Sequence, residues 1–508
     1  MTFKRCSAIV LLVPWLASAS SNGFCAEEEL RSLSPEGVLD YLDLSKPGLE
    51  AVRSKAEAGD RTGALAALLA YYREKYPLPK VAKGSAAGEL AVADRIADHV
   101  FQWGPYEPAD YGPEIDWEWD PRGDIEWVAA VYRFYWAPPL TEAYRATRDE
   151  KYARAFVELT ADWIAKHPLE NRKKTHPVYT SWRGFAWLDI QTGIRADNLS
   201  KVFPVLVHGE AFTPEFLGVL LASLYDHQVK TEKLPMGVVH NKAVFEQRGF
   251  VNVASTFPEF RESRRWMELA LERTRENFLA QTTPDGVQRE WSFGYNVAVL
   301  RDAVDIIKRA ESLGVGASED YRERVRKMYD YLFAIATPEL AGPMFGDASR
   351  SIDVSPDRTR WQLHGTLVEA TRLFGDPKYA ARANLDRSNL PDETSYAFTD
   401  AGMYVLRDDW GPEQVYFPLH CSPLGISGHG HRKPRKAFCY RHAESAPAAF
   451  LTLVVPYRGD ERPQVAAALP EEFEVGADRV ELRVEAFGTT RQIGRDLGQQ
   501  KAWSSDSR

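Results

Sequence analysis

The spacing of apolar residues predicts helices along most of the chain before residue 380. In the segment 61–76, leucine and tyrosine side chains recur every three or four residues, as on a buried helix face. Further helices of this kind are predicted at 126–148, 151–167, 182–198, 214–229, 241–255, 262–281, 292–313, 321–335 and 361–374. Pro138-Pro139 is expected to kink or break the first of these. Short connections between such helices favour antiparallel pairs in a bundle, a solenoid or a closed toroid, and no fixed-period repeat supports a regular solenoid.

The pattern changes beyond residue 380 to short apolar runs separated by glycine and proline. These runs predict strands at 403–407, 414–419, 450–455, 473–475 and 480–484. We therefore expect a helical domain over 27–380 and an antiparallel β-sandwich over 381–508. The segment 431–449 interrupts the strands with a run of basic residues and is either a solvated loop or a coding-level lesion. The lesion is favoured because too few strands are left for a complete sandwich, so the β-domain is expected to be incomplete after His431.

The first 26 residues are typical of a secretory signal peptide. Lys4 and Arg5 give a basic start, 9–16 is apolar, and small residues follow at 17–19. The apolar stretch is too short to span a bilayer, and no later segment is apolar enough to be a membrane helix. We expect export to the periplasm or out of the cell. A length of 508 residues fits two or three domains, and a net charge of −9 argues against nucleic acid as the main partner.

Short motifs follow one another along the chain in a fixed order. They are His240-Asn241-Lys242, Gln247-Arg248-Gly249-Phe250, Phe257-Pro258-Glu259-Phe260, Asp285-Gly286-Val287, Glu290, Gly294-Tyr295, Gly346-Asp347, Tyr404-Val405-Leu406-Arg407, Gly428-His429-Gly430-His431 and Val454-Val455-Pro456-Tyr457-Arg458-Gly459. In this order they resemble the heparinase II/III-like polysaccharide lyases, over roughly residues 95 to 431 and again from near 448. The resemblance implies an α/α toroid followed by a β-sandwich, with the substrate groove between them. It also implies cleavage of uronic-acid-containing polysaccharides by β-elimination.

This elimination removes the C5 proton of a uronate, which requires the neighbouring carboxylate to be neutralised. A neutral hydrogen-bond donor does so without adding a competing base, and Asn241 is predicted for that role. Its alternative role is the N-cap of the helix that follows. Tyr295 is predicted as the general acid for the leaving oxygen and as a possible base, with a core aromatic as the alternative. The basic role needs nearby positive charge, for which Arg289 is the candidate.

The Gly428-His429-Gly430-His431 turn supplies two histidines. By the resemblance, His429 is a second base or a charge-neutralising imidazole, and His431 matches a structural metal ligand. We therefore expect a structural zinc or calcium ion in the β-domain, while the chemistry itself requires no cofactor. The alternative is a pair of surface histidines, because Arg432-Lys433 stands where the family has Ala-Asp. Cys421 and Cys439 form either one disulfide or two free thiols.

A further set of residues is predicted to contact an anionic polysaccharide. The predicted substrate-binding residues are His240, Lys242, Arg289, Glu290, Trp127 and Arg195. Lys242 stands where many relatives have histidine, and either binds a substrate carboxylate or faces solvent. Trp127 and Arg195, with Tyr135 and Trp182, match a groove pattern of aromatic and arginine residues, for which core packing is the alternative.

Two other functions remain open at this point. One is a glycan-binding protein or inactive remnant of a lyase, in which the damaged β-domain cannot complete the site. The other is a glycoside hydrolase on the same helical architecture, which needs two acidic residues flanking the cleaved bond. The candidates for such a pair are Glu246, Glu259, Glu290 and Asp347. The sequence does not distinguish among uronate polymers or oligomeric states.

Overall fold

The structure is a computed structural model. It describes residues 30–78, 87–237, 239–343, 345, 355–411, 414 and 416–420, and the backbone of the strands at 465–468, 479–486, 489–496 and 501–506. The helices are α1 (Glu50–Glu57), α2 (Arg61–Lys75), α3 (Ala87–Ala97), α4 (Ile125–Tyr132), α5 (Ala137–Thr147), α6 (Glu150–Lys166), α7 (Asp189–Leu206), α8 (Pro214–Lys233), α9 (Asn241–Thr256), α10 (Ser263–Gln281), α11 (Phe293–Ser312), α12 (Glu319–Ile335), α13 (His364–Phe374) and α14 (Pro377–Asn384). The strands are β1 (Val100–Phe101), β2 (Ala109–Asp110), β3 (Tyr396–Phe398), β4 (Met403–Arg407), β5 (Tyr416–His420), β6 (Val465–Ala468), β7 (Arg479–Ala486), β8 (Thr489–Asp496) and β9 (Lys501–Asp506).

Short polar side chains fix where many helices begin. The carboxylate of Asp60 accepts a hydrogen bond from the Gly63 backbone N–H at 2.9 Å, and that of Asp149 accepts one from the Lys151 N–H at 3.0 Å. Each satisfies one of the N–H groups that a helix start leaves without a partner. The predicted helix 126–148 is in fact two helices, α4 and α5. Phe134 between them has a positive φ of 58°, and the prolines stand at the start of α5, where proline is tolerated.

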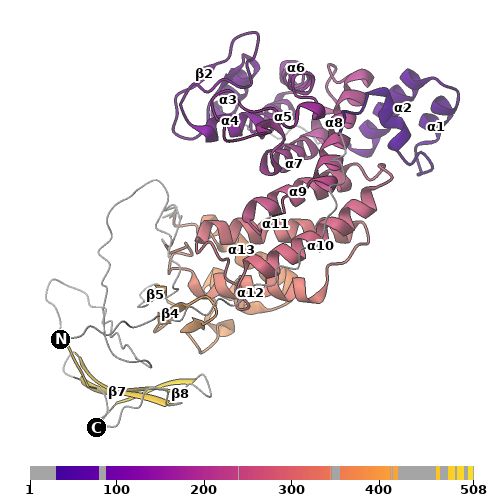
Figure 1. Ribbon diagram of the computed structural model, residues 1–508. Coiled ribbons are helices and arrows are strands. Elements are labelled where there is room, and N and C mark those ends of the chain that lie inside the picture. The colour runs from indigo at the N-terminus through magenta and orange to yellow at the C-terminus, as the bar shows by residue number, and fades with distance from the viewer. Residues whose placement is uncertain are drawn as a thin grey trace, which may run out of the picture.

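The helix α7 lies at the centre of the helical domain. It is buried on nearly all sides and packs closely against α9, which also contacts α10 and α11. In Figure 1, α7 and α9 lie between the group α3–α6 and the group α10–α13, and α8 lies between α5 and α2. Successive helices pair as α1 with α2, α5 with α6, α11 with α12 and α13 with α14. This pairing of successive helices agrees with the helical domain predicted from the sequence.

Strands β3, β4 and β5 form an antiparallel sheet that docks on the C-terminal end of α12. Arg407 of β4 donates from Nη2 to the carbonyls of Ala334 and Ala336, at 3.0 and 2.7 Å. The Tyr416 hydroxyl of β5 donates to the Ile335 carbonyl at 2.5 Å. These groups satisfy carbonyls that a helix end leaves free, and the cation suits the negative end of the helix dipole. Leu406, on the face of β4 opposite to Arg407, is 53% exposed.

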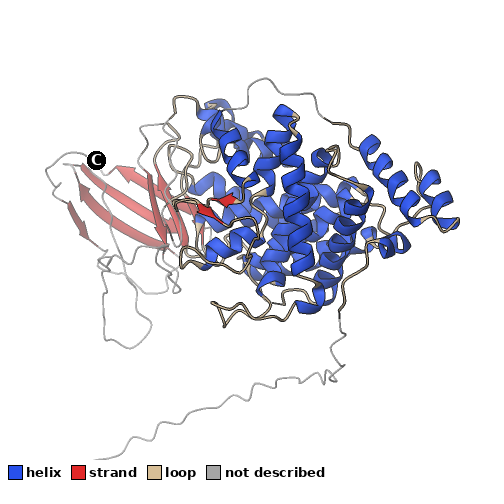
Figure 2. Ribbon diagram, turned by 90° about the horizontal axis from the view of Figure 1, so that it is seen from above, coloured by secondary structure: helices blue, strands red, loops and turns tan. Residues whose placement is uncertain are grey.

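A second antiparallel sheet has the order β6-β7-β8-β9, with Arg479 paired to Asp496 at one end of the β7–β8 hairpin. Figure 2 shows the helices as the body of the molecule and the strands at one side. The fold class is confirmed, because a long helical region precedes antiparallel strands. The predicted strand 403–407 is β4, and 480–484 lies within β7, whereas 450–455 and 473–475 lie outside the described residues.

The structure describes the chain around the predicted domain boundary but not two other predicted segments. The predicted boundary at 380 falls inside α14, so the change from helix to strand takes place between Asn384 and Tyr396. The N-terminal segment 1–26 and the basic segment 431–449 lie outside the described residues. Among the residues that are described, no helix combines the length and apolar character needed to cross a membrane.

Candidate active site

Asn241 is the first residue of α9, and its side chain does not cap the helix. The N-cap is His240, whose Nδ1 lies 3.2 Å from the backbone nitrogen of Lys242 and accepts its N–H. Asn241 is only 3% exposed, and its Nδ2 donates to Oε1 and Oε2 of Glu290 at 2.9 and 2.8 Å. The alternative reading of Asn241 as an N-cap is therefore wrong. Its amide is free of helix capping and forms part of a side-chain site.

The carboxylate of Glu290 is itself held in place by a turn between α10 and α11. Gly286 sits in this turn with a φ of +91°, and a Cβ there would overlap the backbone of Lys327 in α12. The chain then returns past α10, and Gln288 donates from Nε2 to Oε1 of Glu290 at 2.8 Å. The backbone N–H of Glu290 donates back to Oε1 of Gln288 at 2.9 Å. Glu290 is thus held by Gln288 within the same turn.

Tyr295 lies in the first turn of α11, and the charge of Glu290 acts on its phenol. The phenol is half-buried, and its pKa is raised above 10.0, first by burial and then by the negative charges of Glu290 and Glu126. A raised pKa keeps the hydroxyl protonated near neutral pH, which suits a proton donor and disfavours a phenolate base. The Glu290 carboxylate thus accepts from the Asn241 amide and acts by its charge on the Tyr295 phenol.

The positive charge expected beside Tyr295 is not supplied by Arg289. Its side chain is exposed, and its charge instead contributes to lowering the pKa of Arg324 on α12, second to burial. Lys242 is half-buried beside Asn241 and makes no ion pair within the described part of the chain. His240 also contacts Asn241, with its Nδ1 3.2 Å from Oδ1. Substrate contact by Lys242, His240 and Arg289 stays a prediction.

Trp127 and Arg195 belong to the core rather than to a groove. Trp127 is 1% exposed and its indole N–H donates to the Tyr111 hydroxyl at 2.9 Å. Arg195 is 0% exposed, donates from Nε to the His227 imidazole at 2.8 Å, and lies 3.9 Å above the ring of Trp163. Burial lowers the pKa of the Arg195 guanidinium well below its ordinary value. We correct the assignment of these two residues from substrate binding to packing.

Two functional residues were not identified from the sequence. Glu126, at the start of α4, is exposed, forms an ion pair with Arg133 at 2.8 Å and acts on the Tyr295 phenol. Its position gives no sequence signal, because it is far from Tyr295 along the chain. Gln288 stands two residues before Glu290 in a turn that is closed by the Trp291 backbone N–H donating to the Gln288 carbonyl at 3.1 Å. Its closeness to Glu290 in the sequence is the signal by which Gln288 could have been found.

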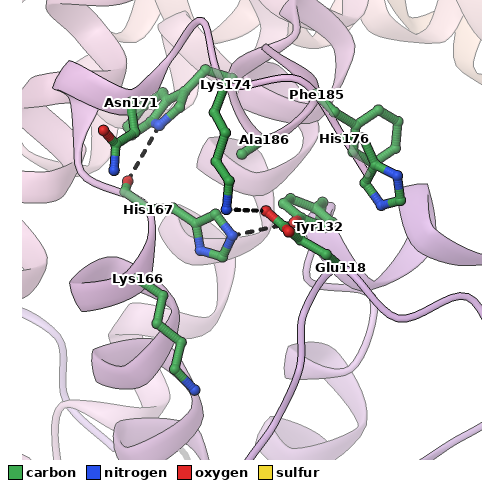
Figure 3. A pocket seen from close by; sticks show the side chains of 10 residues that line it. Glu118, Tyr132, Lys166, His167, Asn171, Lys174, His176, Phe185 and Ala186 are labelled. Carbon is green, nitrogen blue, oxygen red and sulfur yellow. Dashed lines mark hydrogen bonds and ion pairs between the residues drawn. The ribbon is translucent and has the colours of Figure 1, made fainter. Parts of the chain in front are cut away.

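A separate pocket lies between α4, α6 and the connection that leads to α7 (Figure 3). The Lys174 ammonium pairs with Glu118 at 2.6 Å, and the Tyr132 hydroxyl and the His167 imidazole lie 3.2 Å apart. Burial lowers the pKa of His167 to about 4, so its ring is neutral near pH 7. The cavity measures about 20 Å³, enough for one water molecule and too small for a sugar ring. This pocket is structural and does not form part of the Asn241 site.

The imidazole predicted to complete the site cannot be compared with the structure. His429, the metal-ligand candidate His431, and Cys421 and Cys439 lie outside the described residues. Where side chains are described, no group of three or more His, Cys, Asp or Glu residues is placed to hold a metal ion. The metal site and the third catalytic group therefore stay predictions.

Acidic residues that a hydrolase would need are engaged elsewhere. Glu246 is fully buried and accepts from the Lys230 ammonium at 2.9 Å. Glu259 is buried and accepts from the Tyr71 and Tyr72 hydroxyls at 2.8 and 3.1 Å. It also pairs with Lys75 at 2.6 Å, which ties α2 to the turn between α9 and α10. Asp347 lies outside the described residues.

The chain thus combines a long helical domain with antiparallel β-sheets, and a buried amide at the start of α9 is hydrogen-bonded to a carboxylate that stands shortly before α11. The Heparinase II/III N-terminus family model matches residues 38–364, and the chain belongs to this family. A heparin-sulfate lyase of Pedobacter heparinus is 30% identical over 404 residues, which are 76% of this chain and 59% of the relative. One of Bacteroides stercoris is 26% identical over 425 residues, which are 79% of this chain and 62% of the relative.

The fold is also similar to solved structures. The crystal structure of heparan sulfate lyase HepC from Pedobacter heparinus matches with a TM-score of 0.62 and 23% identity, covering 90% of this chain and 76% of that chain. At this identity the likeness supports the fold alone. The chain spans about three fifths of the length of the curated relatives it matches.

Proposed function

We propose that the protein is a polysaccharide lyase that cleaves a uronic-acid-containing glycan by β-elimination. The observation that carries the proposal is the hydrogen bond of the buried Asn241 amide to Glu290, whose charge also acts on the Tyr295 phenol. The family supports it, since both curated relatives described above are heparin-sulfate lyases. A heparan-type glycosaminoglycan is therefore the first substrate to test, ahead of an alginate-type polymer.

The proposed reaction distributes its proton transfers over separate groups. The Asn241 amide donates to the uronate carboxylate, which stabilises the negative charge that develops when the C5 proton leaves. The electron pair of the C5–H bond forms the C4–C5 double bond as the C4–O bond breaks. The Tyr295 hydroxyl gives its proton to the departing oxygen. Because the raised pKa of Tyr295 disfavours a phenolate, we assign removal of the C5 proton to His429.

The test is the formation of a C4–C5 unsaturated uronate, which absorbs in the ultraviolet. Purified full-length protein is incubated with heparan sulfate, heparin, chondroitin sulfate, hyaluronan and alginate, beside the Tyr295→Phe and Asn241→Ala variants. We expect product from a heparan-type glycan with the native chain, and a loss of about 100-fold or more in either variant. Binding without product from any of these polymers would instead identify the chain as a glycan-binding remnant.

A hydrolase is disfavoured by the same structure, because Glu246 and Glu259 are buried in ion pairs. A hydrolase would release reducing ends without ultraviolet absorbance, so both quantities are measured in each reaction. Retained hydrolysis in Tyr295→Phe would support the hydrolase, whose chemistry depends on two carboxyl groups.

Two further parts of the proposal, export and metal binding, are argued from the sequence alone. We propose export to the periplasm or the medium because of the signal-like segment 1–26. Cell fractionation tests this directly. We also propose a structural zinc or calcium ion held with the help of His431, which metal analysis of the native protein and of His431→Ala tests. Equal metal content in the two proteins would exclude that role for His431.

A further inference from the structure

A chain of side-chain hydrogen bonds leads from α10 to the proposed catalytic amide. Gln281, at the end of α10, accepts at Oε1 from Nε2 of Gln288 at 3.2 Å, and it donates to Asn277 one turn earlier. Gln288 donates to Glu290 at 2.8 Å, and Glu290 accepts from Asn241. Gln281 and Gln288 are buried, so water does not compete for these bonds.

The geometry at Asn241 leaves part of its amide available. Nδ2 lies almost equally far from the two oxygens of Glu290, at 2.9 and 2.8 Å. One N–H pointing between the two oxygens accounts for both distances, and it leaves the second N–H for another acceptor. The carboxylate also fixes which end of the amide is nitrogen, because Oδ1 in that position would face Glu290 oxygens without a proton between them.

The charge of Glu290 argues against direct contact with an anionic glycan. A uronate carboxylate placed directly against Glu290 would meet a side chain of the same charge, whereas on the second N–H it is separated from Glu290 by the Asn241 amide. Glu290 therefore fits a role exerted through the neutral Asn241 amide rather than on the sugar. This differs from the substrate contact predicted for Glu290 from the sequence.

We infer that Glu290 and Gln288 are positioning residues, which hold the Asn241 amide with one N–H directed at the substrate carboxylate. The inference rests on the proposed lyase function and identifies what orients its neutralising group. Asn241 is the catalytic residue, Glu290 fixes its orientation, and Gln288 fixes Glu290.

Kinetics of variants separate this role from substrate binding. Removing a hydrogen bond to a charged group costs about 10- to 100-fold, so Glu290→Ala should lower kcat by that factor with little change in KM. Glu290→Gln keeps an acceptor for the Asn241 amide and should lose less. Gln288→Ala should show a smaller loss of the same kind. Glu272→Ala, an exposed carboxylate on α10, serves as the control.

A double-mutant cycle gives the decisive comparison. In an Asn241→Ala background, Glu290→Ala should change kcat by no more than about 2-fold, because its effect passes through the missing amide. An equal loss in both backgrounds, or a raised KM with unchanged kcat, would overturn the inference.

Crystal structures of the variants test the orientation of the Asn241 side chain without any measurement of turnover. The Asn241 side chain should keep its orientation in Glu290→Gln and turn away in Glu290→Ala. An unchanged Asn241 side chain in Glu290→Ala contradicts the inference even if the protein turns over no glycan. A native protein that yields no unsaturated product would contradict the lyase function, and the structures would still decide what orients Asn241.

Discussion

Gly249 of α9 lies against Gly193 of α7, with no room for a side chain between the two helices. A Cβ on Gly249 would overlap the carbonyl oxygen of Gly193, and a Cβ on Gly193 would overlap the backbone of Phe245 and Glu246. Only glycine allows two helix backbones to approach so closely. Asn241 begins the same helix about two turns earlier, so this crossing sets the position of the proposed catalytic amide.

Replacing Gly249 with alanine should therefore destabilise the protein. Overpacking of this kind costs about 1–3 kcal/mol, since backbone atoms cannot move aside as a flexible side chain can. The expected result is a lower Tm in thermal unfolding. Gly365→Ala is the matched control, because Gly365 is also helical and a Cβ there meets open space. It should be neutral or slightly stabilising. Equal Tm values for the native chain and Gly249→Ala would contradict the tight crossing.

The helices that the sequence predicts best are those with one apolar face and a clear start. The prediction 241–255 corresponds to α9, and 214–229 corresponds to α8, which starts with Pro214 after the Thr213 cap. The prediction 182–198 was misplaced, because α7 begins at Asp189 and runs to Leu206. This helix is buried on nearly every side and contains Pro204, so neither periodicity nor a proline boundary marks its ends.

Site residues could be proposed from the sequence only where a side chain suited to the elimination also stands in one of the ordered motifs. Asn241 and Tyr295 were predicted from their motifs. In the structure the Asn241 amide donates to Glu290, and the charge of Glu290 adds to burial in raising the pKa of the Tyr295 phenol. Trp127 and Arg195 were misassigned, because an aromatic or arginine residue at helical spacing looks the same in a groove as in a core. The difference depends on which face of α4 and α7 meets other helices, and a single sequence does not contain that information.

The charge of Glu126 should raise the pKa of Tyr295, although the two residues are far apart in the sequence. Glu126→Gln removes one of the two negative charges acting on the phenol, so the pKa of Tyr295 should fall. The substitution also leaves the positive charge of Arg133 without its Glu126 partner, and that charge favours the phenolate as well. The alkaline limb of kcat/KM, where the acid loses its proton, should therefore move to lower pH.

The measurement for Glu126 is a spectrophotometric titration of tyrosinate. Subtracting the curve of Tyr295→Phe isolates the Tyr295 signal in each background. A pKa of Tyr295 that stays the same or rises in Glu126→Gln would show that the charge of Glu126 does not reach the phenol.

Glu259 should stabilise the fold and take no part in turnover. Glu259→Gln keeps the shape of the side chain but leaves the Lys75 ammonium half-buried without its partner carboxylate. Breaking a buried pair on one side costs about 3–5 kcal/mol. We expect a large drop in Tm with kcat of the folded fraction unchanged. A normal Tm with abolished activity would instead place Glu259 in a hydrolytic site.

Arg407 should hold the first sheet on α12. Arg407→Met keeps an unbranched stem but removes the guanidinium from the Ala334 and Ala336 carbonyls. The Ala336 carbonyl still accepts from Arg382 at 3.2 Å, but the Ala334 carbonyl loses the Arg407 donor. A buried acceptor left without a donor costs about 1–3 kcal/mol, so unfolding should occur at lower denaturant concentration. The control is Arg387→Met, whose exposed pair with Asp409 should contribute less than about 1 kcal/mol. Equal losses in the two variants would contradict the docking role of Arg407.

Asp226 makes stability depend on pH in an unusual direction. It lies on α8 and accepts the Leu33 backbone N–H at 3.0 Å, which anchors the beginning of the described chain. Burial, with the nearby charge of Glu170, raises the pKa of Asp226 to about 8. In the unfolded chain the carboxyl loses its proton near 3.8. Between these values, unfolding releases a proton, and rising pH therefore favours the unfolded state.

Asp226→Asn removes this titration while the amide oxygen still accepts the Leu33 N–H. Its stability relative to the native chain should grow by about 1.4 kcal/mol for each pH unit between about 4 and about 8, and then level off. Denaturant unfolding at several pH values gives the difference directly, with the exposed Asp392→Asn as a control. Because all other groups titrate equally in the two proteins, a difference that does not change with pH would show that Asp226 is ionised in the folded state. If Asp226 is neutral in the folded state, its contact with the Leu33 N–H should weaken in alkaline solution. The carboxyl must then either carry an uncompensated buried charge or leave its site.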